Sequence, residues 1–215
     1  MLFMFGGARR RVKRVLHEAL AIAVRSEDAY AEGRSICTAG YLAQQEGSWR
    51  ESAATLRRAV ELLKGQAREA TLVIDFIGIM QLNNLRWLGE LQKISEEFPP
   101  YLADARERGR QSQELLAQLT AGFLLPLCDD DPEAAEEIVA AAEQRIAGQS
   151  FNSQHLVALE VRLLILLYRG QGSRAWELYL QSKRALARAD SLRVEFYRVL
   201  WCHLRAVVVL SGGQP

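Results

Sequence analysis

The sequence predicts an all-α protein of about ten antiparallel helices, arranged as a superhelix of repeated helical hairpins. Two observations predict this class. Short turn signals recur at a constant spacing, and the stretches between them place apolar residues three and four positions apart, as an α-helix with one buried face does. No run alternates apolar and polar residues between turn signals, so we expect no β-strand.

The turn signals have a period of 41 to 42 residues. They centre on four residues that are 42, 42 and 41 positions apart: Gly47, Gly89, Asp131 and Gly172. Extending the period in both directions reaches Gly6 and Gly213. A fixed period of this kind is the signature of a repeat array, in which each unit packs on its neighbours. We therefore expect a single helical-repeat domain over residues 1–215.

Each interval between turns contains two predicted helices. In chain order they span residues 9–25, 28–45, 49–64, 67–87, 90–109, 111–127, 132–147, 153–169, 173–189 and 191–211. The third carries one apolar stripe, formed by Trp49, Ala53, Leu56, Val60 and Leu63. The fifth contains Pro99 and Pro100. Because proline lacks an amide hydrogen and clashes with the preceding turn, we expect a kink or a short break there.

The seventh predicted helix has a clear start. Asp131 is a suitable N-cap, and Pro132 suits the first helical position, whose amide needs no partner. Its apolar stripe consists of Ala135, Ile138, Val139, Ala142 and Ile146. Glu133, Glu136 and Glu137 follow near the positive end of the helix dipole. Helix initiation accounts for this acidic cluster better than a metal site does.

The last helices differ in how much of their surface is apolar. The helix at 153–169 is apolar nearly all round, so we expect neighbours to cover it on both sides. In the final helix, one predicted core stripe joins Leu192, Phe196, Val199, Leu200, His203, Val207 and Leu210. This stripe would place His203 on or beside the core. His155 follows Asn152 at a helix start, where a capping or inter-helix hydrogen bond is favoured over catalysis.

Composition and charge exclude several classes of protein. The chain of 215 residues is 49% hydrophobic and 25% charged, with a formal net charge of +1. This balance gives no reason to expect nucleic acid or a membrane as a partner. Cys37, Cys128 and Cys202 form no CxxC pair, which predicts neither a disulfide framework nor a metal site. We expect three reduced, mostly buried thiols in a cytoplasmic protein.

One concentrated charge lies near the start, in the basic run Arg9, Arg10, Arg11, Lys13 and Arg14. Cations at a helix start oppose the helix dipole, so helix electrostatics do not explain the run. Nucleic acid or an anionic surface is one reading. A solvated helix face, or a patch for an acidic partner, is favoured because no base-stacking aromatic residues are interleaved with the charges.

The sequence lacks the usual catalytic templates. It contains no GxGxxG or GxxxxGK[ST] loop, no HExxH, no GxSxG and no His-Arg-Asp or Asp-Phe-Gly. We therefore predict a protein that is not an enzyme, with no cofactor, no metal and no catalytic residue. Asp75 interrupts the apolar stretch 73–77. It faces a groove or pairs with an arginine of the next helix, and the pair is favoured because an isolated buried carboxylate is costly.

One interval follows the spacing of the tetratricopeptide repeat (TPR). Gly40, Gly47, Trp49, Leu56 and Ala59 are seven, two, seven and three residues apart. The period of 41 to 42 residues exceeds the usual 34, so these units would have longer helices. A further series of motifs occurs in order: Leu88-Gly89-Glu90-Leu91, Ala105-Arg106-Glu107-Arg108-Gly109, Asp130-Asp131-Pro132-Glu133-Ala134-Ala135, Phe151-Asn152-Ser153-Gln154-His155, Leu167-Tyr168-Arg169-Gly170, Ala175-Trp176, Leu192-Arg193-Val194-Glu195 and His203-Leu204-Arg205-Ala206.

This series resembles the TPR-like region that follows the catalytic domain in bacterial eukaryote-type serine/threonine protein kinases. The resemblance covers roughly residues 15 to 210 and is best in the second half. It implies a TPR-like superhelix, a role in signalling, and a kinase domain as a partner in the same chain or in another. No kinase catalytic residue has a matching position here. A stand-alone relative, a truncated product and a fragment of a kinase all remain open.

The predicted function is a protein–protein interaction scaffold that holds a protein or peptide segment in a concave groove. The alternative is a C-terminal sensor or regulatory part of a multidomain kinase or signalling ATPase. A third reading is self-association through the array ends, at 6–14 and 207–210. The candidate partner-binding residues are polar side chains on helices that could line the groove: Gln44, Asn83, Asn84, Arg86, Gln118, Arg162 and Arg169. The sequence does not identify the partner.

Overall fold

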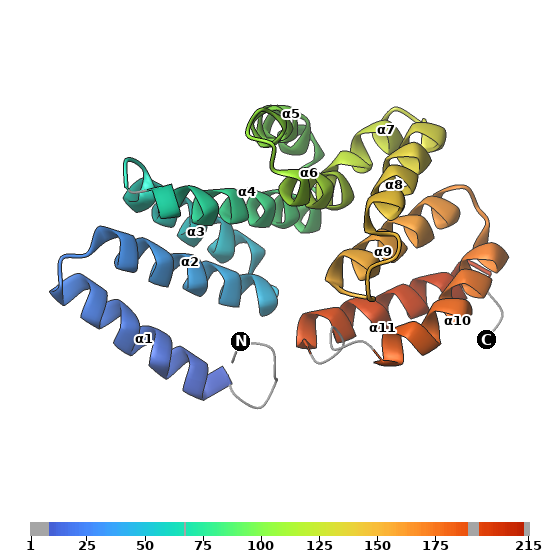
Figure 1. Ribbon diagram of the computed structural model, residues 1–215. Coiled ribbons are helices and arrows are strands. Elements are labelled where there is room, and N and C mark those ends of the chain that lie inside the picture. Colours follow the sequence, from blue (N-terminus) through green and yellow to red (C-terminus); the bar gives the residue numbers. More distant parts are fainter. Residues whose placement is uncertain (1–8, 67, 189–193, 213–215) are drawn as a thin grey trace. The chain divides into compact units, whose positions relative to one another are not determined.

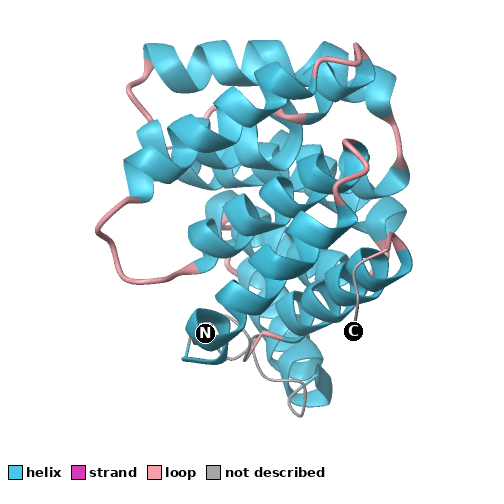
Figure 2. Ribbon diagram, turned by 90° about the vertical axis from the view of Figure 1, so that its right-hand side faces the viewer, coloured by secondary structure: helices cyan, strands magenta, loops and turns pink. Residues whose placement is uncertain are grey.

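The computed structural model describes residues 9–66, 68–188 and 194–212 of the chain. The described residues form helices joined by short turns, and no strand occurs among them (Figures 1 and 2). The elements are α1 (Arg9–Arg25), α2 (Ala29–Gln45), α3 (Trp49–Leu63), α4 (Arg68–Leu88), α5 (Leu91–Glu107), α6 (Gln111–Ala117), a π-turn (Gln118–Gly122), α7 (Leu124–Cys128), α8 (Pro132–Ile146), α9 (Ser153–Tyr168), α10 (Gly172–Arg188) and α11 (Glu195–Leu210). The all-α prediction is confirmed.

Left-handed residues follow many of the helices, and every second one of them falls at a regular spacing. Gly47, Gly89, Asp130 and Gly170 all have positive φ, and they are 42, 41 and 40 residues apart. The left-handed conformation lets the last helical carbonyls accept hydrogen bonds from the turn, and glycine adopts it without strain. The predicted turns near Gly47, Gly89 and Asp131 are therefore present. The turn predicted near Gly172 spans 169–171, directly before α10, and Gly172 is the first residue of that helix. The predicted turns at Gly6 and Gly213 lie outside the described residues.

The chain divides into two compact units, residues 1–113 and 114–215. In the first unit, each of the helices α1 to α4 packs on the next helix along the chain. Helices α2 and α3 approach each other closely: a Cβ added to Gly40 would lie 2.7 Å from Leu56, and one added to Gly33 would lie 2.7 Å from Leu63. These glycines let two antiparallel helices meet; Gly40 belongs to the residues that follow the TPR-type spacing, and Gly33 does not. Leu56 is completely buried there.

The second unit has its core between the π-turn, α8 and α9. The predicted stripe of α8 is confirmed, because Ala135, Val139, Ala142 and Ile146 are buried against α9. Asp131 caps this helix by accepting a hydrogen bond from the Ala134 amide at 2.9 Å. Helix α9 is covered by α8, α10 and α11, as its apolar surface predicts.

A second cap confirms the interpretation of His155. Its Nδ1 accepts a hydrogen bond from the Asn152 amide at 3.2 Å, while Asn152 Oδ1 accepts from the amides of Gln154 and His155. The two side chains thus form a reciprocal capping box at the start of α9. His155 is a structural residue of this helix.

Two expectations about helix continuity do not hold in full, because the short break expected in the fifth helix is absent and the sixth helix is divided. Helix α5 runs unbroken through Pro99 and Pro100. Both prolines lie on its exposed side, while Ile94, Phe98 and Ala105 anchor the opposite face. The carbonyls that lose their amide partners therefore face water, which can replace the missing hydrogen bonds.

The single helix expected over 111–127 is divided into α6, the π-turn and α7. Pro126 cannot donate to the carbonyl of Gly122. The Phe123 amide donates to the Gln118 carbonyl, five residues back, at 3.1 Å. This places one extra residue in the turn, which is the mark of a π-bulge.

The predicted core face of α11 is wrong in part: Leu200 is buried as expected and Phe196 and Val207 are half-buried, but other members are exposed. Leu200, Trp201, Leu204 and Val208 are buried, whereas Val199 is 63% exposed and His203 lies at the surface. The cause is the ring of Trp201, which stacks on Tyr179 of α10 with centroids 4.2 Å apart. This contact turns α11 about its axis relative to the prediction. Leu192 lies outside the described residues.

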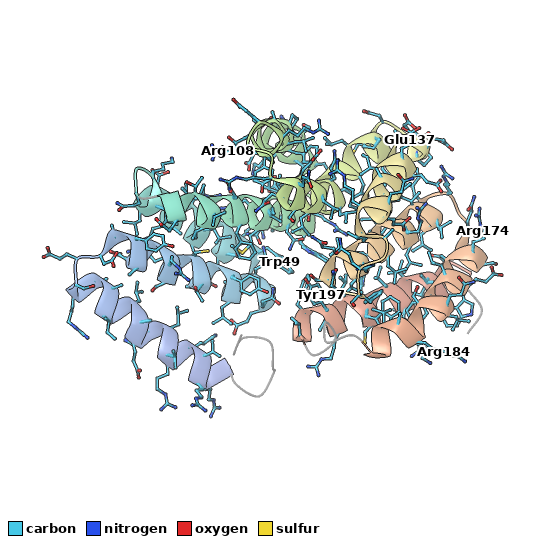
Figure 3. All side chains as sticks on the ribbon, viewed as in Figure 1. Trp49, Arg108, Glu137, Arg174, Arg184 and Tyr197 are labelled. Carbon is cyan, nitrogen blue, oxygen red and sulfur yellow. The ribbon has the colours of Figure 1, made fainter. Side chains whose placement is uncertain are left out.

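The cysteines are less buried than expected. Cys37 is buried, while Cys128 and Cys202 are exposed, and all three are free thiols. Burial raises the pKa of the Cys37 thiol to about 11. Charged side chains such as Arg108, Arg174 and Arg184 lie on the outside of the helices (Figure 3).

Candidate functional site

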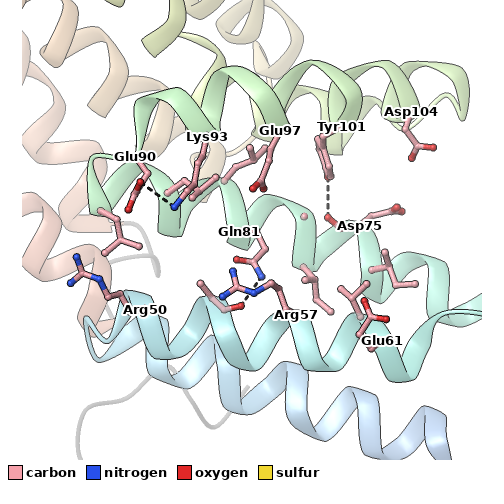
Figure 4. Close-up of a pocket in the computed structure, with 18 residues that line it drawn as sticks. Arg50, Arg57, Glu61, Asp75, Gln81, Glu90, Lys93, Glu97, Tyr101 and Asp104 are labelled. Atoms are coloured by element: carbon pink, nitrogen blue, oxygen red, sulfur yellow. Dashed lines mark hydrogen bonds and ion pairs between the residues drawn. The ribbon is translucent and has the colours of Figure 1, made fainter.

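A groove of about 690 Å³ opens on the first unit between α3 and α5, with α4 as its floor (Figure 4). We call it the α3–α5 groove. On the α3 wall it extends from Arg50 to Glu61, eleven residues or roughly 16 Å at the helical rise of about 1.5 Å per residue. It is therefore long enough for a segment of polypeptide.

The floor of the groove is apolar. Helix α4 contributes Ile74, Gly78, Leu85 and Leu88, and α3 contributes Val60. These side chains are buried or half-buried in the isolated chain. Asp75 and Gln81 are the polar residues of the floor, and Gln81 Nε2 donates to the Ala53 carbonyl at 3.0 Å and so ties α4 to α3. A ligand that covers the floor would remove apolar surface from water.

The two walls carry net charges of opposite sign, although Glu61 lies on the α3 wall and Lys93 on the α5 wall. Arg50 and Arg57 rise from α3, and Glu90, Glu97 and Asp104 rise from α5. All five lie at the mouth of the groove, where they would contact the flanks of a bound ligand. The groove is thus polarised across its width.

Some of these wall charges are already paired. Lys93 contacts Glu90 at 3.2 Å, and Arg108 contacts Asp104 at 2.7 Å. In contrast, the structure shows no ion pair for Arg50, Arg57 or Glu97 with any of the residues that it describes. These three charges are available to a partner.

Contacts around Asp75 tie neighbouring elements together near the Tyr101 end of the groove. The hydroxyl of Tyr101 donates to the Asp75 carbonyl at 2.9 Å, and the Asp75 carboxylate pairs with Arg110. The prediction that Asp75 pairs with an arginine is confirmed. Arg110 lies in the segment after α5, one element later than the helix we expected. Burial raises the pKa of Tyr101 to about 12, and the nearby Asp104 charge contributes.

The predicted partner-binding residues do not line the α3–α5 groove. Gln44 and Asn84 are buried, with exposed fractions of 3% and 0%. Gln44 Nε2 donates to Asn84 Oδ1 at 2.8 Å, and Asn84 Nδ2 donates to Ser52 Oγ at 3.0 Å. These side chains hold α2, α3 and α4 together. They offer no exposed surface to a partner.

The other two candidates of the first unit, Asn83 and Arg86, lie on α4 and are half-buried. The Arg86 guanidinium lies 5.7 Å from the ring centroid of Trp87. That ring in turn stacks on Trp49, with centroids 5.5 Å apart. Arg86 therefore covers an aromatic contact between α3 and α4.

In the second unit, Arg162 and Arg169 of α9 form an ion-pair ladder with α8. Arg162 bonds Glu143 and, at 3.0 Å, Glu136. Arg169 contacts Glu136 at 2.7 Å and Glu133 at 3.0 Å. The hydrogen bond with Glu143 is the main cause of the raised pKa of Arg162. The acidic cluster of α8, interpreted as a helix-initiation signal, supplies one side of this ladder.

Gln118, the remaining residue of the predicted partner-binding set, is half-buried in the π-turn. Its Oε1 is buried and accepts no hydrogen bond from the described chain. The structure thus separates the seven predicted residues: four belong to the first unit and three to the second.

A sequence signal for the groove walls exists. Arg50 and Arg57 are seven residues apart, and so are Glu90, Glu97 and Asp104. Seven residues is close to two helical turns, so each set lies along one side of its helix. The sequence prediction missed these rows of charge because it considered only the apolar residues of each helix.

Comparisons with protein-family models, curated proteins and solved structures give no match to this chain. Among the described residues, no group of three or more His, Cys, Asp or Glu side chains is placed to hold a metal ion. Every helix in that part of the chain is too short or too polar to cross a membrane.

Proposed function

We propose that this chain is a protein-interaction module without catalytic activity, and that the α3–α5 groove holds a segment of its partner. The observation that carries the proposal is the groove itself, an elongated apolar floor between two charged walls. Interfaces of this composition, with an apolar centre and a polar rim, are typical of peptide and protein recognition.

We also propose that the helices form a TPR-like superhelical array. The 40- to 42-residue spacing of the left-handed turns supports this arrangement, as does the packing of each helix on its sequence neighbours within each unit. Repeat arrays of this kind act mainly as binding surfaces. The link to kinase signalling stays a prediction that depends on the resemblance of motifs. Three free thiols favour the cytoplasm as the compartment.

Site-specific photo-crosslinking tests the proposed groove. The photoreactive residue p-benzoylphenylalanine replaces Lys93, which lines the groove, or Ser95, which is exposed on the same helix but does not line it. We expect irradiation in cell extract to join discrete proteins to the Lys93 variant alone. Equal crosslinking at both positions, or none at Lys93, would contradict a binding role for the groove.

A further inference from the structure

The α3–α5 groove has the charge pattern of one side of a helical bundle. We propose that its occupant is an amphipathic α-helix of a partner protein, with an apolar face, carboxylates along one flank and lysines or arginines along the other. This inference rests on the proposed binding function and specifies the chemistry of the partner. Its starting point is the seven-residue spacing of the wall charges.

The charged residues of the two walls follow one another in the same direction along the groove and at the same seven-residue interval. In Figure 4, Arg50 lies opposite Glu90 near one end of the groove, and Arg57 lies across from Glu97 further along. Helices α3 and α5 therefore run the same way on either side of α4. A ligand helix lying over α4 would place its own residues beside these charges every seven positions, as in coiled coils.

The floor favours a helix over an extended strand. The groove is lined by the side chains of three helices, and none of its lining residues belongs to a strand. An extended peptide would find no sheet edge with which to pair its own backbone groups. A helix satisfies its backbone internally and presents only side chains, which suits a floor of Val60, Ile74, Leu85 and Leu88.

The walls then select the flanking charges. Arg50 and Arg57 have no ion-pair partner in the described chain, so carboxylates along one flank of the ligand would form ion pairs with them. Glu97 on the other wall similarly attracts a lysine or arginine. A ligand whose flanks were both acidic would meet the α5 wall, and one whose flanks were both basic would meet the α3 wall, with like charges adjacent. Such juxtapositions reduce binding and give specificity.

The same walls disfavour nucleic acid as the ligand. A phosphate backbone is uniformly negative, and the acidic line of α5 would repel it along its length.

Designed peptides test the charge pattern directly. Three fluorescent peptides of about 14 residues share one leucine stripe at the a and d positions. They differ at the flanking e and g positions: one has glutamate on one flank and lysine on the other, one has only glutamate and one has only lysine. Exchanging the two flanks is no control, because a helix turned end for end in the groove presents its flanks exchanged.

Binding is measured by fluorescence anisotropy with the full-length chain and with the double variant Arg50→Glu/Arg57→Glu, which makes both walls acidic. With the unaltered protein we expect the split-charge peptide to bind about tenfold more tightly than either uniform peptide. With the double variant we expect the all-lysine peptide to bind most tightly. Arg14→Glu/Arg25→Glu is the matched control, since it changes two exposed arginines of α1 and the net charge equally.

The outcomes separate the inference from the proposed function. The same order of affinities in all three proteins, or no binding of the split-charge peptide up to about 1 mM, overturns the inference. If Lys93 crosslinking still captures proteins in that case, the groove binds a partner of different chemistry. If crosslinking fails as well, the proposed function fails with it. Circular dichroism of each variant establishes that its helices are intact.

Discussion

At the scale of single residues, Gly78 decides how closely α5 approaches α4. A Cβ at this position would lie 2.3 Å from Cε2 of Tyr101, well inside van der Waals contact. The ring of Tyr101 therefore occupies the space that a larger residue would fill. Its hydroxyl then reaches the Asp75 carbonyl at 2.9 Å. Glycine within a helix lowers helix propensity, and here the cost is offset by this contact between helices.

Replacing Gly78 by alanine should destabilise the protein, although alanine is the better helix former. The added methyl group forces Tyr101 out of its position, and we expect a loss of about 1–3 kcal/mol in the free energy of unfolding. In a Tyr101→Ala background the steric conflict is absent. There the same change should stabilise by about 0.5–1 kcal/mol, because only helix propensity remains.

Urea denaturation of the two single variants, the double variant and the unaltered protein measures this reversal of sign. Gly40→Ala is a useful comparison, because its added Cβ would conflict with Leu56 and not with Tyr101. Its destabilisation should persist in the Tyr101→Ala background. A destabilising effect of Gly78→Ala that is equally large in both backgrounds would contradict the contact.

The buried amides show why partner-binding residues are difficult to predict one at a time. Gln44 and Asn84 are polar residues on helices, which makes them reasonable candidates for an exposed groove. Their positions 40 residues apart place them on α2 and α4, where they bond each other and Ser52 across α3. A buried polar group is stable when its hydrogen bonds are satisfied, and only tertiary structure reveals such a network.

At the scale of elements, the α8–α9 ladder joins two helices through charged side chains at their surface. Arg162 and Arg169 are seven residues apart and so are Glu136 and Glu143, which places two rows of opposite charge along the contact. The side chains are partly exposed, with 21% for Arg162 and 42% for Glu143. Solvent therefore screens the pair, and each ion pair contributes modestly to stability.

A double-mutant cycle should measure that contribution. We expect Arg162→Met and Glu143→Gln to show a coupling energy of about 0.5–1 kcal/mol in thermal or urea unfolding. Raising the ionic strength to about 1 M should reduce it, because the Debye length falls to roughly 3 Å. The exposed pair Lys64–Glu61 serves as the control and should give a smaller coupling, since both side chains are more than 60% exposed. A coupling that is no larger than in this control would contradict a stabilising ladder.

Most helices were predictable because local signals specify them. Turn glycines, the Asp131 cap and apolar stripes place α2, α3, α8 and α9 within one or two residues of their expected bounds. The errors lie where tertiary contacts override local preference. Packing of Ile94 and Phe98 keeps α5 continuous through two prolines, and the Trp201–Tyr179 stack turns α11 away from its expected face. The groove was missed because its walls come from separate helices.

At the scale of the whole molecule, each of the two compact units has a core of its own. In the first unit, Leu56 and Ile77 are buried among residues of α2, α3 and α4. In the second, Val139 and Ile165 are buried among residues of the π-turn, α8 and α9. When packing is mainly between neighbouring helices, stability is approximately a sum of local terms, and a defect weakens its own neighbourhood most.

Hydrogen exchange followed by mass spectrometry tests this locality. Leu56→Ala and Ile165→Ala each remove most of a buried aliphatic side chain, one from each core. Such truncations cost about 2–5 kcal/mol. We expect Leu56→Ala to accelerate amide exchange in α2, α3 and α4 well before it affects α8 and α9, and Ile165→Ala to do the reverse. Because the two substitutions are similar in size, each serves as the control for the other. An equal acceleration over both units in both variants would show that the chain opens as one cooperative block.

If the acceleration is local, the two units open independently. A partner bound in the α3–α5 groove would then slow amide exchange in the first unit selectively, and this protection would identify the unit that binds the partner.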